Sequence, residues 1–119
     1  MVVDLLTSET LSEPQADRIF QALADATRRD ILARAIEREQ SVSALARRYE
    51  MSLTAVQKHV AVLERAALVS KQRSGREQHV GANPETLRKA STLLAAFEQL
   101  WIKRATKIAE ILAEEGTGT

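Results

Sequence analysis

Residues 41–66 read SVSALARRYEMSLTAVQKHVAVLERA and contain two residues suited to the start of a helix, Ser41 and Ser52. A serine hydroxyl at such a position accepts a hydrogen bond from a backbone N–H group of the first turn. The pattern predicts a short helix from Ser41 to about Tyr49, a tight turn, and a second helix over about residues 52–66. Two short helices joined in this way are typical of a helix-turn-helix unit.

The second of these helices has an apolar face and a polar face. The apolar residues recur at the spacing of one buried side, and they are Leu53, Val56, Val60, Leu63 and Ala67. The residues left facing outward are Thr54, Gln57, Lys58 and Ala61. A helix fits the major groove of DNA, and outward residues near its N-terminus can reach base edges. We therefore expect this helix to bind DNA.

Particular side chains on this helix suit particular contacts. Gln57 can form two hydrogen bonds with adenine, Lys58 can donate to guanine, and the Thr54 methyl group can contact a thymine methyl. Ser52 and the N–H groups at the helix start can hold a phosphate. His59 fits either a base or phosphate contact or a packed side chain. The DNA-binding residues expected here are Ser52, Thr54, Ala55, Gln57, Lys58 and His59.

After this helix the pattern changes to one typical of a β-hairpin. Residues 68–73 and 77–80 favour strands, and Ser74, Gly75 and Arg76 favour a turn between them. This predicts a wing over about residues 68–80. A basic residue at a wing tip can enter the adjacent minor groove, so we expect DNA contacts from Lys71, Arg73 and Arg76. Simple solubilising charge is the alternative for all three.

Charge is concentrated in this middle part of the chain. Residues 47–76 carry seven Lys or Arg side chains and two Glu, a net +5, whereas the whole chain has a net charge of +1. Phosphate contacts need such a basic face. An ordinary solvated surface would explain the same charge pattern, so composition alone leaves both interpretations open.

Two helices are expected before the helix-turn-helix unit. Ser12 caps the first, with Pro14 in the first turn and Gln15 completing a capping box. Its buried stripe is expected to comprise Ile19, Phe20 and Leu23. Asp25 caps the second, whose inward side is expected to comprise Ile31, Leu32, Ala35 and Ile36.

A long helix is expected at the end of the chain. Asn83 and Pro84 form a strong helix start, and no helix breaker follows before Gly116. A helix over about residues 84–114 would be ~45 Å long, more than a domain of this size can cover. We expect its apolar stripe to pack inward on Phe20 and outward on a second copy of the chain. The expected dimer-interface residues are Leu87, Leu94, Phe97, Trp101, Ile108 and Leu112.

Composition limits the other possibilities. The chain has 119 residues, 45% of them hydrophobic and 3% aromatic, which predicts one α-rich domain over residues 12–115, with flexible ends at residues 1–11 and 116–119. It has no cysteine and no stretch apolar enough to span a membrane, so we expect a cytoplasmic protein. No paired nucleophile and base, glycine-rich phosphate loop or H-x-x-x-H spacing is present, so we expect no enzymatic activity.

Three segments together resemble the ArsR family of transcriptional repressors. Residues 20–32, FQALADATRRDIL, resemble its opening signature; residues 52–63, SLTAVQKHVAVL, resemble its recognition helix; and residues 66–69, AALV, resemble the lead into its wing. The resemblance covers about residues 16–112. It implies a mainly α fold with a small β-hairpin, a winged helix-turn-helix that dimerises through its N- and C-terminal helices. It also implies a repressor that binds an inverted-repeat operator, of its own promoter in some members.

Metal-sensing members of that family carry ligands that this chain lacks. Where arsenic and cadmium sensors have a Cys-x-Cys pair, this chain has Ser41, Val42 and Ser43, and its C-terminal helix contains no histidine. We therefore expect no metal and no other cofactor. Double-stranded DNA and a second copy of the chain are the expected partners, and an effector is not indicated. The alternative is a winged-helix module that works through protein contacts.

Overall fold

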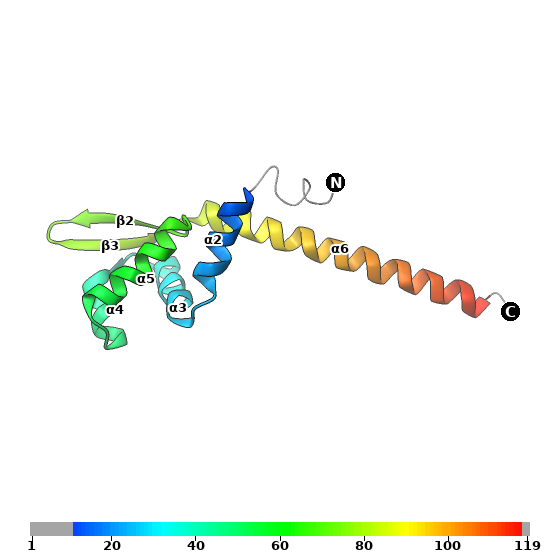
Figure 1. Cartoon of the computed structure of the whole chain (residues 1–119), viewed down its shortest axis with the longest axis horizontal. Coiled ribbons are helices and arrows are strands. Elements are labelled where there is room, and N and C mark those ends of the chain that lie inside the picture. Colours follow the sequence, from blue (N-terminus) through cyan, green and yellow to red (C-terminus); the bar gives the residue numbers. More distant parts are fainter. Residues whose placement is uncertain (1–10, 118–119) are drawn as a thin grey trace.

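The computed structural model describes residues 11–117, and its elements confirm the mainly helical fold with a small sheet (Figure 1). The four helices of the body are α2 (Glu13–Leu23), α3 (Ala26–Glu37), α4 (Val42–Tyr49) and α5 (Leu53–Arg65). The strands are β1 (Gln40–Ser41), β2 (Val69–Ser74) and β3 (Glu77–Ala82), and the last element is the helix α6 (Pro84–Thr117).

Each helix of the body begins at a residue whose side chain accepts a backbone hydrogen bond. Ser12 accepts from the N–H of Gln15 at 3.2 Å, Asp25 from Arg28 at 3.0 Å, Ser41 from Ala44 at 3.3 Å and Ser52 from Ala55 at 3.1 Å. All four caps are the ones that the sequence predicts. Local hydrogen bonding therefore sets where these helices begin.

Two of the helices end at residues with left-handed backbone conformation. Glu50, after α4, has φ 53°, and Ala67, after α5, has φ 59°. In each case the next backbone N–H bonds back into the helix: Met51 to the Ala46 carbonyl at 3.1 Å, and Leu68 to the Leu63 carbonyl at 3.0 Å. These closures turn the chain sharply after both helices of the helix-turn-helix.

The core lies where α2, α3, α4 and α5 meet the base of the sheet. Val56, Val60 and Leu63 are fully buried, as the periodicity of α5 predicts. The buried face ends at Ala66, not at Ala67 as expected, because the helix has already ended there. Phe20, Ile36 and Leu53 were also expected to be buried, and this is wrong, because all three are exposed. They lie at the edge of their apolar faces or beyond the core.

The wing is a hairpin with an additional strand. The sheet order is β1-β3-β2, and every pairing is antiparallel. Ser74 pairs with Glu77, so the turn contains two residues, and the strands extend to residue 82 instead of residue 80. The sequence did not indicate β1, which pairs Gln40 with Val80 and thereby attaches the wing to the start of α4.

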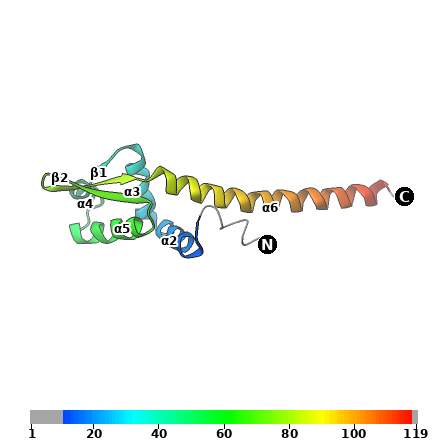
Figure 2. The same ribbon diagram turned by 90° about the horizontal axis from the view of Figure 1, so that it is seen from above.

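The first turns of α6 pack on the body, and the rest of the helix projects from it (Figure 2). Ala90 and Leu93 are buried, and Leu87, expected in a dimer interface, is half-buried against the core of its own chain. The molecule measures 76 × 28 × 20 Å as a result. The expected inward packing on Phe20 is not found at Trp101, whose side chain is 65% exposed.

The ends of the described region differ from the expected flexible segments. Leu11 is 2% exposed and belongs to the core, so it is not part of a loose end. At the other end, α6 continues through Gly116 to Thr117. The remainder of the two expected flexible segments, residues 1–10 and 118–119, lies outside the described residues.

Candidate nucleic-acid interface

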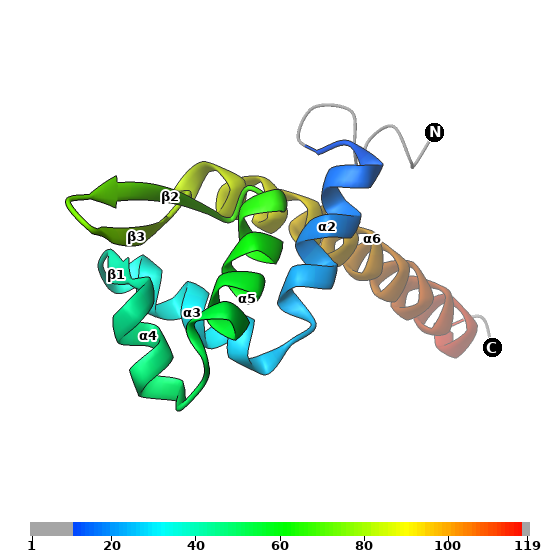
Figure 3. The same cartoon turned by 60° about the vertical axis from the view of Figure 1, so that its left-hand side comes forward.

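The outward face of α5 carries most of the side chains that the sequence selects for DNA binding. Ser52, Thr54, Gln57 and Lys58 are exposed, and Ala55 is half-buried. The helix stands between the wing on one side and α2 on the other (Figure 3). Because α5 lies at the surface along its length, its outward residues can approach a surface as wide as a DNA groove.

His59 lies on a different side of α5. Its Nδ1 atom is 3.9 Å from a carboxylate oxygen of Asp25, and only 22% of its side chain is exposed. The N–H of Arg28 is the main cause that lowers the pKa of Asp25, with a smaller contribution from His59. The structure thus places His59 against the α2–α3 turn, away from the outward residues of α5.

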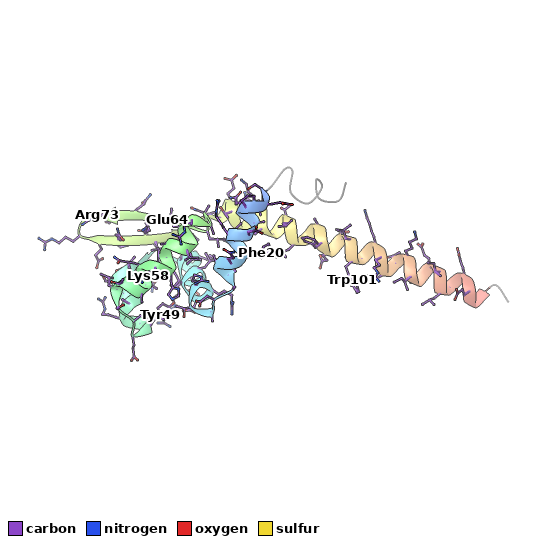
Figure 4. All side chains as sticks on the ribbon, in the orientation of Figure 1. Phe20, Tyr49, Lys58, Glu64, Arg73 and Trp101 are labelled. Carbon is purple, nitrogen blue, oxygen red and sulfur yellow. The ribbon has the colours of Figure 1, made fainter. Side chains whose placement is uncertain are left out.

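A hollow of about 200 Å³ lies between the N-terminal half of α5 and the wing. It brings Gln57 together with Arg73 and Arg76, which the sequence selects separately. Both arginines are exposed, and Arg73 lies near the wing tip (Figure 4). The other lining residues are not among the DNA contacts expected from the sequence; they are Val42, Ser43, Leu53, Glu77 and Gln78.

Lys71 has a partner within the chain. Its Nζ atom is 3.4 Å from a carboxylate oxygen of Glu64, which lies on α5. This ion pair is a contact between the wing and α5. Lys71 therefore has a structural contact in addition to the DNA contact that the sequence predicts.

A polar cluster holds the first helix of the helix-turn-helix against α3. The Tyr49 hydroxyl and the Arg34 Nε both donate to the same oxygen of Asp30, the latter at 2.8 Å. These hydrogen bonds, first from Tyr49 and then from Arg34, lower the pKa of Asp30. Burial, followed by the bond to Asp30, raises the pKa of Tyr49. The sequence does not indicate this cluster, because Tyr49 is 19 residues from Asp30 in the chain.

The two arginines of the opening signature hold the end of α2. Arg28 donates from Nε to the Ala22 carbonyl at 2.8 Å and from Nη2 to the Gln21 carbonyl at 3.0 Å, and Arg29 donates to the Leu23 carbonyl at 2.7 Å. The last carbonyls of a helix lack intrahelical partners, so these bonds satisfy them. The signature therefore fixes the angle between α2 and α3.

The predicted dimer-interface residues, apart from Leu87, are exposed on the projecting part of α6, and Figure 4 shows Trp101 there. Within residues 11–117, no set of three or more possible metal ligands comes together. None of the helices in this range has the length and apolarity needed to cross a membrane.

Comparison with known proteins gives consistent results. Residues 12–72 match a family described as a helix-turn-helix domain. The HTH-type transcriptional regulator Rv2034 of Mycobacterium tuberculosis is 36% identical over 103 residues, which cover 87% of this chain and 94% of that relative.

Two solved structures show the same architecture. An ArsR-like transcriptional regulator from Rhodococcus sp. RHA1 matches with a TM-score of 0.73 at 33% identity, covering 82% of this chain and 92% of that one. A homodimeric winged helix-turn-helix DNA-binding domain, Mb0332 from Mycobacterium bovis, matches with a TM-score of 0.60 at 25% identity, covering 72% of this chain and 81% of that one. The chain therefore belongs to the ArsR family of winged helix-turn-helix transcriptional regulators.

Proposed function

We propose that this regulator is a repressor that binds an inverted-repeat operator as a homodimer, its own promoter being the first candidate target. One observation carries this proposal: α5 presents Thr54, Gln57 and Lys58 outward at its N-terminal end, directly beside a wing with two exposed arginines. Polar side chains for base edges and cations for phosphates thus lie on one surface. Such a protein acts in the cytoplasm, where bacterial DNA lies.

The dimer is supported by the projecting part of α6. Its exposed apolar side chains include a set that follows the spacing of one helix face and continues the stripe that Leu87 and Leu93 bury against the body. The proposed interface consists of Leu94, Phe97, Trp101, Ile108 and Leu112, next to Leu87. A large exposed apolar patch of this kind usually marks an interface. In the dimer, the two α5 helices would lie about one helical turn of DNA, ~34 Å, or a multiple of it apart.

A mobility-shift titration with the DNA upstream of the protein's own gene tests the proposal. Gln57→Ala and Lys58→Ala should each cost roughly 1–3 kcal/mol on the operator and relax sequence preference, because base contacts are lost. Arg76→Ala should weaken binding and reduce its salt dependence. Lys103→Ala, on α6, serves as the charge-matched control. Unchanged operator binding by both α5 variants would contradict the assignment of Gln57 and Lys58 as residues that contact bases.

Footprinting then tests the operator geometry. A homodimer should protect two half-sites related by a two-fold axis, on one side of the duplex. Binding as a monomer, or protection of a single half-site at saturation, would overturn the inverted-repeat model. If no duplex is bound above the level of random DNA, the winged helix works through protein contacts instead.

A further inference from the structure

A second basic pocket lies on the other side of α5, away from the wing. Its volume is about 270 Å³, and its lining comes from α2 and α5 together with the start of α3. The lining residues are Arg18, Gln21, Arg28, Val62 and Arg65. Three of the five are arginines, and none is acidic. None of them is among the DNA contacts expected from the sequence.

The three guanidinium groups are held in different ways. Arg28 lines the pocket and is held by its bonds to the α2 carbonyls. Arg18 and Arg65 are exposed, and neither forms an ion pair with a carboxylate within residues 11–117. No acidic residue lines the pocket, although the Asp25 carboxylate interacts with Arg28 from outside the lining. Like charges placed together repel one another, and an oxyanion relieves that repulsion. The pocket is therefore suited to an anionic group.

Helix geometry connects this pocket to the outward face of α5. Arg65 follows Lys58 by seven residues, so the two side chains leave α5 on the same outward face, about two turns apart. Figure 3 shows α2 and the wing on opposite sides of α5. The pocket is lined from the α2 side, whereas Arg73 and Arg76 come from the wing. Guanidinium groups thus lie along both flanks of the recognition helix.

The phosphates of DNA lie in a matching arrangement, along both sides of the major groove. The major groove is about 12 Å wide and a helix with its side chains is about 10–12 Å across, so a helix in the groove has a phosphate strand along each flank. We propose that the pocket of Arg18, Arg28 and Arg65 binds the DNA backbone on the α2 side of the groove, opposite the wing. The inference rests on the proposed function, and it extends the interface to residues of α2.

A free phosphate ester has the same chemistry as a backbone phosphate and is the main competitor for this pocket. The geometry favours DNA, because the pocket opens beside the outward face of α5 and Arg65 belongs to that face. An occupied pocket would help to position α5, since its lining joins the recognition helix to α2. The phosphate contacts would thereby support base reading without contributing sequence information.

The test uses Arg18→Gln and Arg65→Gln in the full-length protein, with binding measured by fluorescence anisotropy over a series of KCl concentrations. Each substitution removes two contacts from a dimer, so the slope of log K against log salt should become shallower by about 1.8. At ~0.15 M salt this corresponds to an affinity loss of about thirtyfold. The loss should be equal on the operator and on an unrelated duplex.

Lys103→Gln is the control for loss of one positive charge, because Lys103 is exposed and lies on α6 away from the pocket. It should leave affinity and slope nearly unchanged. Thermal unfolding of each variant checks that the fold is retained, which is expected because Arg18 and Arg65 are exposed. Variants that fold and bind both duplexes like the wild type would overturn the inference.

Inorganic phosphate distinguishes the two sources of the anion. If the pocket serves DNA, Arg65→Gln should lose DNA affinity, whether or not phosphate raises the wild-type melting temperature more than KCl of equal ionic strength does. A specific rise that Arg65→Gln abolishes while this variant binds DNA like the wild type would assign the pocket to a free anion and overturn the DNA assignment. If Gln57→Ala relaxes sequence preference while both pocket variants bind normally, only this inference fails. If the wild type binds no DNA, the proposed function fails as well.

Discussion

The body of the protein, residues 11–93, buries most of its large apolar side chains within one chain, whereas the projecting part of α6, residues 94–117, exposes them. Leu45 in α4 is 1% exposed, and Leu112 in α6 is 62% exposed. A leucine side chain thus stabilises the fold by burial in the body, whereas on the projecting part of α6 it remains exposed. The comparison indicates that the body can fold as a single chain. The apolar side chains on the projecting part of α6 need a second surface to be buried.

The largest expected effect tests this contrast with one substitution in each region. Leu45→Ala should lower the free energy of unfolding by roughly 2–5 kcal/mol, because it leaves a cavity in the core. Leu112→Ala should change it by less than about 0.5 kcal/mol in dilute, monomeric protein, because little is buried there. Urea unfolding at a concentration where sedimentation shows monomers measures both. Similar losses in the two variants would mean that Leu112 is buried in the single chain.

The next effect concerns the association of two chains. Trp101→Glu should weaken dimerisation by roughly 2 kcal/mol or more, about thirtyfold in Kd, because an aromatic anchor is replaced by a charge. Lys103→Glu is the control: it also places a glutamate on α6, but on nearly the opposite side of the helix from Trp101. Sedimentation equilibrium measures Kd for both. A dimer that tolerates Trp101→Glu as well as Lys103→Glu must use a different interface.

A smaller effect is expected inside the body, at the contact between α3 and α4. Tyr49→Phe removes the hydroxyl that donates to Asp30 and should cost about 1 kcal/mol of stability at neutral pH. Urea unfolding of the variant and the wild type measures this difference. Equal stabilities at neutral pH would show that the hydrogen bond contributes nothing net.

The same contact should give a pH dependence with a definite sign. The folded pKa of Asp30 is lowered, so its contribution is present above the ordinary aspartate pKa of 3.8 and is lost as pH falls through the folded pKa. The folded pKa of Tyr49 is raised, so its contribution is present below 10.0 and is lost as pH rises through the folded pKa. The difference between wild type and Tyr49→Phe should therefore narrow at both extremes of pH. A difference that widens in acid would contradict this assignment.

Local sequence signals predict the helices, the two hairpin strands and much of the outward face of α5. The caps at Ser12, Asp25, Ser41 and Ser52 involve hydrogen bonds between residues three apart, so they can be recognised without a tertiary fold. The outward position of Gln57 and Lys58 follows from the same helical repeat. Periodicity does not show how far the core extends, which is why exposed Leu53 was expected to be buried.

What the sequence determined by itself is the order of the helices and of the two hairpin strands, the helix-turn-helix with its wing, and the family, because each depends on residues close together in the chain. The tertiary structure alone decided which distant side chains meet. Arg18 and Arg65 line one pocket because α2 packs against α5, Lys71 reaches Glu64 because the wing folds beside α5, and His59 faces Asp25 for a similar reason. The physical reason is that such contacts depend on how helices cross, and the angle between two helices is set by packing over many residues at once.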